Sequence, residues 1–124
     1  MSKKILMIDY EREIAGAIVA KSARKGRTML MDREWDAVIF NNGLGAKMEE
    51  YDLLSWMLEQ KRIRPPEIFI SCMNGIAVER ITDALLANNY MSVNPKRFVD
   101  KNYEGQLLTR GDMKMHKSSD AMRI

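Results

Sequence analysis

The sequence predicts a single small α/β domain, with a mostly parallel sheet of four to five strands, covering helices and a C-terminal extension. Two observations predict this fold class. The short apolar runs at 5–8, 36–41 and 67–71 have polar residues on both sides, as is typical of buried central strands. Each run is followed by polar residues and then by a helical pattern, which is the alternation expected of a parallel sheet.

The composition fits one domain. A chain of 124 residues with 46% hydrophobic residues can build one core. Its single cysteine, Cys72, excludes an intramolecular disulfide and fits a reducing compartment. The first apolar run is too short for a signal peptide and no run is long enough to span a membrane. We therefore expect a cytoplasmic protein.

The segment between the first strand and the strand at 36–41 has two interpretations. In one, residues 11–25 form a helix and 27–31 a strand, but residues 32–35 are then too few for a parallel crossover. In the other, a strand lies within 16–21, Ser22 caps a helix over 23–33, and Gly26 costs that helix about 1 kcal/mol relative to Ala. We favour the second, although it leaves only residues 10–15 between the first two strands.

The rest of the domain is easier to assign. Tyr51, Leu54 and Leu58 have the spacing of one helix face, which predicts a helix over 51–61. Pro65-Pro66 favours an extended backbone just before the next strand. A second helix is predicted to begin after Asn74 and to end at 88–89 (Asn-Asn), followed by an edge strand at 90–93.

The periodicity fades near residue 100. We therefore divide the chain into a domain over 1–99 and a loosely ordered basic extension over 100–124, in which Leu107 or Leu108 is a candidate to dock on the body. The formal net charge is +3, and residues 1–91 are neutral, so the excess comes from 92–124. Without clustered arginines this is weak support for nucleic-acid binding, which we do not expect.

Polar residues follow the three predicted strands where an open parallel sheet binds its ligands. The candidate ligand-binding residues are Asp9, Glu11, Asn41, Asn42, Ser71 and Asn74. Asp9 and Glu11 are also the candidate metal ligands, and Mg²⁺ is the cofactor that such carboxylates favour, although a solvated loop is the simpler interpretation. No catalytic residue is assigned, because Ser71 has no base near it in sequence and the single histidine, His116, lies in the extension.

Several short motifs occur in a fixed order along the chain. They are Trp35-Asp36, Asn41-Asn42-Gly43-Leu44-Gly45, Glu50-Tyr51-Asp52 with Trp56, Pro65-Pro66, and Ser71-Cys72-Met73-Asn74. Over residues 4–90 this order resembles the receiver domains of response regulators, and more closely the receiver-like family named for cyclic-phosphate processing. The resemblance implies a receiver or flavodoxin-like fold.

The chain departs from that family at its functional positions. The family's Asp-His-Asp-Leu-Gly motif corresponds to residues 41–45, where Asn41, Asn42 and Gly43 replace the three functional residues. Its His-Ser motif begins at Ser71, so the histidine is replaced there as well. An amide neither accepts a phosphoryl group nor acts as a general base. The resemblance therefore implies a degenerate, non-catalytic receiver-like domain.

Three functions remain open at this point. The first is a non-catalytic protein-interaction or regulatory module with a protein partner. The alternative is a binder of a phosphorylated or cyclic nucleotide without efficient turnover, in which Asn41, Asn42 and Asn74 contact phosphate or base. The second alternative is a weak metal-dependent phosphoesterase that uses Asp9 and Glu11. We expect no membrane partner, and a homodimer stays open.

Overall fold

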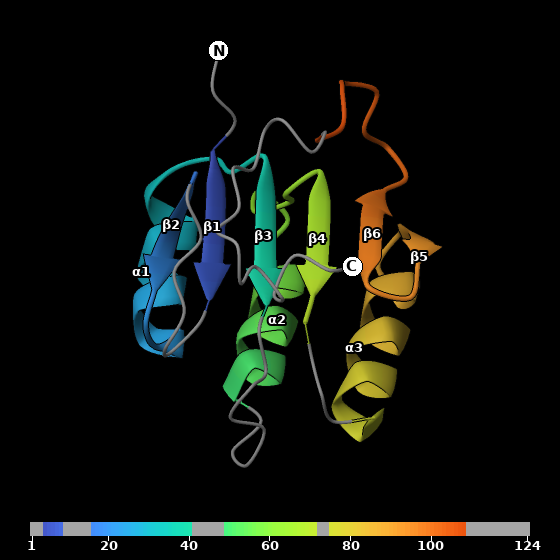
Figure 1. Cartoon of the computed structure of the whole chain (residues 1–124), viewed down its shortest axis with the longest axis horizontal. Coiled ribbons are helices and arrows are strands. Elements are labelled where there is room, and N and C mark those ends of the chain that lie inside the picture. Colours follow the sequence, from blue (N-terminus) through green and yellow to red (C-terminus); the bar gives the residue numbers. More distant parts are fainter. Residues whose placement is uncertain (1–3, 9–15, 41–48, 72–74, 109–124) are drawn as a thin grey trace.

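The computed structural model describes residues 4–8, 16–40, 49–71 and 75–108, which form a six-stranded sheet and three helices (Figure 1). The elements are β1 (Ile5–Ile8), β2 (Ala17–Ala20), α1 (Ala23–Asp32), β3 (Ala37–Phe40), α2 (Glu49–Glu59), β4 (Glu67–Ile70), α3 (Gly75–Ala87), β5 (Tyr90–Asn94) and β6 (Arg97–Asp100). The predicted α/β class is confirmed.

The sheet is mostly parallel, as predicted. Its strand order is β2-β1-β3-β4-β6-β5, and the first four of these strands are parallel to one another. β6 is antiparallel to β4, and β5 is antiparallel to β6, so the last two strands form a hairpin at one end of the sheet. The sequence predicted four to five strands. It missed β6 because this short strand begins and ends with charged residues, Arg97 and Asp100, and only Lys96 separates it from Pro95.

The second interpretation of the segment after β1 is correct. β2 pairs with β1 in parallel, and Ile5 lies opposite Ala17. The Ser22 hydroxyl accepts a hydrogen bond from the Lys25 backbone N–H at 3.1 Å and so caps α1. The helix predicted to end at 88–89 is α3. Asn89 follows it with a φ of 65° and leads into β5 in the left-handed conformation typical of helix C-termini.

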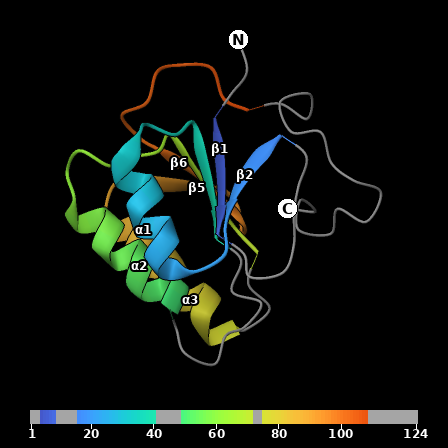
Figure 2. The same ribbon diagram turned by 90° about the vertical axis from the view of Figure 1, so that its left-hand side faces the viewer.

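All three helices lie on one face of the sheet (Figure 2). Alternation along the strands divides the buried side chains between the two faces, so that Leu6 and Ile8 join the helix-side core while Ile5 and Met7 point to the other side. The helix-side core is the larger of the two and also contains Phe40, Leu54 and further side chains from all three helices. This core fixes the positions of the strands relative to one another and to the helices.

The smaller cluster on the opposite face includes a residue of the predicted extension. Leu108 is buried there with Phe69, and its backbone is held by two side chains of the sheet. Its N–H donates to Glu67 Oε1, and its carbonyl accepts from Arg97 Nη2 at 3.1 Å. The described part of the extension therefore docks at Leu108, while the boundary between 99 and 100 stays a prediction.

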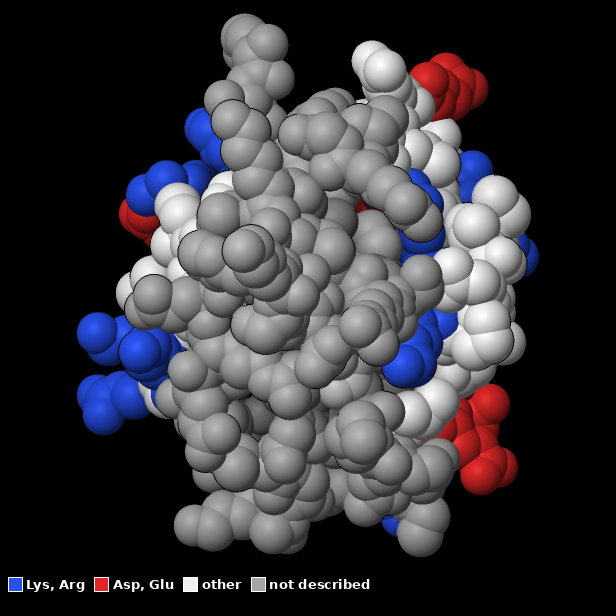
Figure 3. All heavy atoms as spheres, in the orientation of Figure 1, with Lys and Arg blue, Asp and Glu red and all other residues white. Residues whose placement is uncertain are grey.

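Figure 3 shows the side of the molecule that faces away from the helices. Basic side chains stand at its left margin, the side of α1 and β2, and in separate groups toward the right. The expectation that the chain does not bind nucleic acid stays a prediction, because residues 109–124 lie outside the described residues.

Candidate functional site

The carboxyl ends of the three central strands lie level with one another. Ile8 pairs with Phe40 across β1 and β3, and Phe40 pairs with Ile70 across β3 and β4. The chain therefore leaves all three strands at one edge of the sheet, the lower edge in Figure 1. We call it the C-terminal edge. It is the place where an open parallel sheet binds ligands, as expected from the sequence.

Ser71 is the predicted site residue that the structure places. Its backbone N–H donates to the Phe40 carbonyl at 2.8 Å, which extends the pairing of β3 and β4 by one residue. The residue is half-buried and lies at the C-terminal edge. The other five candidates lie outside the described residues: Asp9, Glu11, Asn41, Asn42 and Asn74. Their convergence with Ser71 stays a prediction.

The metal prediction falls on the same undescribed residues. In the ranges 4–8, 16–40, 49–71 and 75–108, no group of three or more His, Cys, Asp or Glu side chains is arranged to hold a metal ion. Asp9 and Glu11 are not among these residues, so Mg²⁺ binding by this pair also stays a prediction. No helix in the described part of the chain is long and apolar enough to cross a membrane.

A polar cluster that the sequence did not reveal lies at the opposite edge of the sheet. Arg64 forms a two-point ion pair with Asp100, with Nε–Oδ2 and Nη2–Oδ1 distances of 3.1 and 2.8 Å. Its guanidinium lies over the Tyr90 ring, with Cζ 4.6 Å from the ring centroid, which is within the range of a cation–π contact. The Tyr90 hydroxyl donates to the Pro65 carbonyl at 2.7 Å. These contacts join the loop before β4 to the β5–β6 hairpin.

The ion pair changes the acidity of its members. Burial by itself raises the pKa of Asp100, but the hydrogen bonds from Arg64 and from the Asn102 N–H, together with the Arg64 charge, outweigh it, and the pKa is lowered. The hydrogen bond to Asp100 raises the pKa of Arg64 despite partial burial. Burial raises the pKa of the Tyr90 hydroxyl. At neutral pH, the cluster therefore holds one anion, one cation and a neutral phenol.

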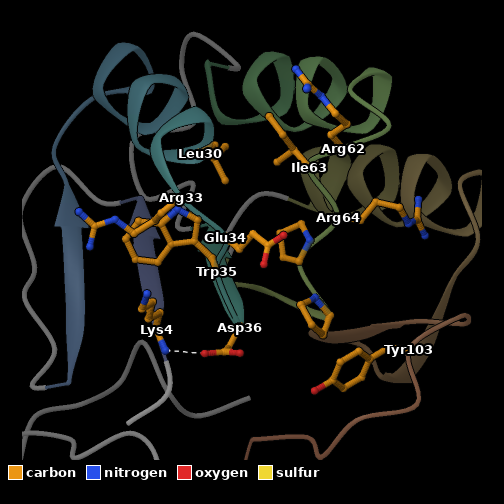
Figure 4. A pocket seen from close by; sticks show the side chains of 12 residues that line it. Lys4, Leu30, Arg33, Glu34, Trp35, Asp36, Arg62, Ile63, Arg64 and Tyr103 are labelled. Atoms are coloured by element: carbon orange, nitrogen blue, oxygen red, sulfur yellow. Dashed lines mark hydrogen bonds between the residues drawn. The ribbon is translucent and has the colours of Figure 1, made fainter. Parts of the chain in front are cut away.

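The same edge carries a hollow of about 460 Å³ (Figure 4). It lies between the end of α1, the loop after α2 and the starts of β1, β3 and β4, and we call this the N-terminal edge. Its lining residues are Lys4, Leu30, Arg33, Glu34, Trp35, Asp36, Arg62, Ile63, Arg64, Pro65, Pro66 and Tyr103. Sequence reasoning missed it because most of these positions are in connections between elements and come from separate parts of the chain.

A second hollow of about 600 Å³ adjoins the first and continues across the ends of α1 and α2. The two share Leu30, Arg33, Glu34, Arg62 and Ile63. We call the two hollows together the edge groove. The edge groove lies at the N-terminal edge, whereas the sequence-predicted site lies at the C-terminal edge.

One comparison identifies the family. The model of the cyclic-phosphate processing receiver domain matches residues 4–87, well over half of the chain. The chain belongs to this family. Membership confirms the resemblance found in the sequence and supports a regulatory receiver module. Searches of curated proteins and of solved structures found no match.

The limits of the match correspond to a structural boundary. The cyclic-phosphate processing receiver region ends at Ala87, which is the last residue of α3. The antiparallel β5–β6 hairpin, with the Arg64 partner Asp100, follows beyond it. The parallel strands and the three helices therefore lie within the matched residues, and the hairpin follows them along the chain.

Proposed function

We propose that this receiver-like domain is a non-catalytic regulatory module that acts by binding a protein partner. The observation that carries the proposal is the replacement of the family's Asp-His-Asp by Asn41, Asn42 and Gly43. A carboxylate can take up a phosphoryl group or a proton, whereas an amide or a glycine cannot. The residues that would perform phosphoryl chemistry after β3 are thus absent from the sequence.

The retained scaffold supports this proposal. The ends of β1, β3 and β4 are in register, and Ile8, Phe40 and Ile70 are fully buried beneath the C-terminal edge. The framework of the family is therefore kept although the acid–base residues of its motif are changed. A domain that keeps this framework without that chemistry remains suited to binding. A cytoplasmic location is part of the proposal, and the single cysteine supports it.

Turnover by the purified full chain tests the proposal. We would incubate it with Mg²⁺ and either a nucleoside 2′,3′-cyclic phosphate or acetyl phosphate, and follow both by phosphorus NMR. We expect no hydrolysis above the protein-free rate. The matched variant Asn41→Asp/Asn42→His/Gly43→Asp restores the family motif. Turnover by this variant alone would show that the three replacements abolish catalysis in the wild-type chain.

The two alternatives predict different results, one in the turnover experiment and one in a thermal melt. Hydrolysis by the wild-type chain that is lost in Asp9→Asn and Glu11→Gln would overturn the proposal in favour of a metal-dependent phosphoesterase. A rise of several degrees in melting temperature with a nucleotide, without turnover, would instead favour a nucleotide-binding domain. Neither result is expected from a domain that recognises a protein.

A further inference from the structure

We propose that the edge groove binds an acidic peptide segment of a protein partner. An apolar residue that stands between the acidic residues of that segment contacts the apolar walls of the groove. This inference rests on the proposed function, because it assigns the surface on which the partner binds. The surface lies at the N-terminal edge, away from the residues that replace the family's catalytic motif. Charge complementarity, apolar walls and the length of the groove support it.

Charge is the first argument. Basic side chains outnumber acidic ones in the lining: Lys4, Arg33, Lys61, Arg62 and Arg64 against Glu34 and Asp36. Asp36 is already engaged, since its Oδ2 accepts a hydrogen bond from the backbone N–H of Lys4 at 2.6 Å (Figure 4). Arg64 is engaged by Asp100. Because a backbone N–H is neutral, Asp36 keeps its charge, and the remaining lining charges are four cations and the carboxylates of Glu34 and Asp36.

Those cations are available to a ligand. Lys4, Lys61 and Arg62 are exposed, and none forms a side-chain ion pair with the described residues. Arg33 pairs with Asp32 at 3.3 Å, but the two side chains are 46% and 63% exposed. An ion pair in that position contributes little and exchanges readily with another carboxylate. A peptide with several acids can therefore engage Arg33, Arg62 and Lys61 together.

The carboxyl ends of two helices disfavour anion binding, but less strongly than the basic side chains favour it. The carboxyl ends of α1 and α2 face the groove and carry partial negative charge. Neither helix has a basic residue in its last turn, so the arginines and lysines lie beyond the ends, in the loops. Full charges on exposed loop side chains outweigh the partial charges of the two termini. The groove therefore stays attractive to anions.

The walls provide an apolar contact. Leu30 and Trp35 are buried side chains at the groove, and Ile63 is half-buried beside them. The indole of Trp35 is fixed in place, because its Nε1 donates to the Met29 carbonyl at 2.9 Å. Met31 lines the groove with a side chain that is 62% exposed. The apolar surface open to a ligand therefore comes from Met31 and Ile63, which a leucine or phenylalanine between acidic residues can contact.

The length of the groove favours a peptide over a small anion. The first hollow alone, at about 460 Å³, is in the size range of a small-molecule pocket. The second continues it past Arg33 and Arg62 to Gln60 and Lys61. An inorganic phosphate would occupy only one cluster of cations. An extended segment contacts both hollows and all four available cations.

Fluorescence anisotropy of the full chain tests the proposal. The probe is a fluorescein-labelled pool of twelve-residue peptides in which Asp or Glu alternates with Leu, Phe or Val. A matched pool carries Asn or Gln in place of the acids. We expect Arg33→Glu/Arg62→Glu to weaken binding of the acidic pool at least tenfold. The control Arg24→Glu/Arg80→Glu makes the same change of net charge at exposed positions outside the groove and should stay within twofold.

A second variant removes dependence on charge reversal. Met31→Gln replaces an exposed apolar side chain in the groove wall by a neutral polar one, leaves the core intact and should also weaken binding of the acidic pool. The proposal fails if the wild-type chain does not bind that pool, if the amide pool binds equally well, or if both double variants lose affinity equally. It also fails if phosphate or AMP alone competes for the groove at low millimolar concentration. The turnover test is independent, so catalysis would overturn the proposed function without affecting these affinities.

Discussion

Gly26 of α1 lies against Ile8, the last residue of β1, so closely that even a methyl group on Gly26 would overlap the Ile8 side chain. A Cβ on Gly26 would lie 2.7 Å from Ile8 Cδ1 and 2.9 Å from Leu53 Cδ2. All three residues are buried. The glycine that lowers the helix propensity of α1 is therefore what lets this helix approach both β1 and α2.

Gly26→Ala should destabilise the domain. The gain in helix propensity is about 1 kcal/mol, whereas overpacking a closed core costs about 1–3 kcal/mol, so we expect a net loss of about 1 kcal/mol. Urea unfolding measures the loss as a lower midpoint at constant slope. Thr28→Ala, at an exposed position of the same helix, is the matched control and should not lower the midpoint. Equal or higher stability of Gly26→Ala would show that Ile8 and Leu53 can move aside.

Glu67→Gln should loosen the attachment of Leu108. Glu67 is 1% exposed and accepts a hydrogen bond from Arg97 Nε at 2.8 Å and another from the Leu108 N–H. The amide turns a donor toward Arg97 or toward the Leu108 N–H, and we expect a loss of about 2 kcal/mol. The control is Asp83→Asn, which removes an exposed acid of α3. Equal midpoints in urea for both variants would contradict this role of Glu67.

The Arg64–Asp100 pair should contribute stability that depends on pH. Because the pKa of Asp100 is lowered in the folded chain, its contribution is complete above the usual carboxyl pKa, near 3.9. It is lost as the pH falls through the lower, folded value. We expect Asp100→Asn to cost about 1–2 kcal/mol at neutral pH. Thermal melts between pH 7 and pH 2 should show the gap between wild type and variant closing at the acid end, and a constant gap would refute the assignment.

Asn41→Asp should create Mg²⁺ affinity if Asp9 and Glu11 converge with it at the C-terminal edge. Three carboxylates are a hard oxygen site of the kind that Mg²⁺ binds. The readout is a melting temperature that rises with Mg²⁺ and returns with EDTA. Asn102→Asp makes the same chemical change at an exposed turn near the other edge and should show no such rise. Without a metal-dependent shift in Asn41→Asp, the predicted convergence is wrong.

The sequence revealed those parts of the fold whose signals are local. β1, β3 and β4 are apolar runs, and the Ser22 cap marks the start of α1. Contacts between distant residues carry no such signal. Arg64 and Asp100 are 36 positions apart, and nothing near either residue indicates the other. The edge groove was missed for the same reason, because its walls come from four separate segments.

For the candidate site at the C-terminal edge, too, the sequence predicts some features and not others. The level ends of the strands follow from parallel pairing, which the alternation of apolar runs and helices predicts. Ser71 is where that reasoning expects it. The positions of the side chains in the connecting loops depend on loop conformation, which apolar patterning does not encode. For Asp9 and Asn41, the prediction therefore rests on strand order alone.

Arg64 belongs to two structures at once, since it lines the edge groove and also fastens the β5–β6 hairpin through Asp100. Separating the hairpin from β4 would leave this guanidinium without its carboxylate, beside cations that already repel it. Local opening of the β5–β6 hairpin therefore costs free energy for two reasons, the lost ion pair and the repulsion between cations. In hydrogen exchange, the amides of β6 should be protected together with those of the loop that carries Arg64, as one cooperative unit that spans the end of the family match.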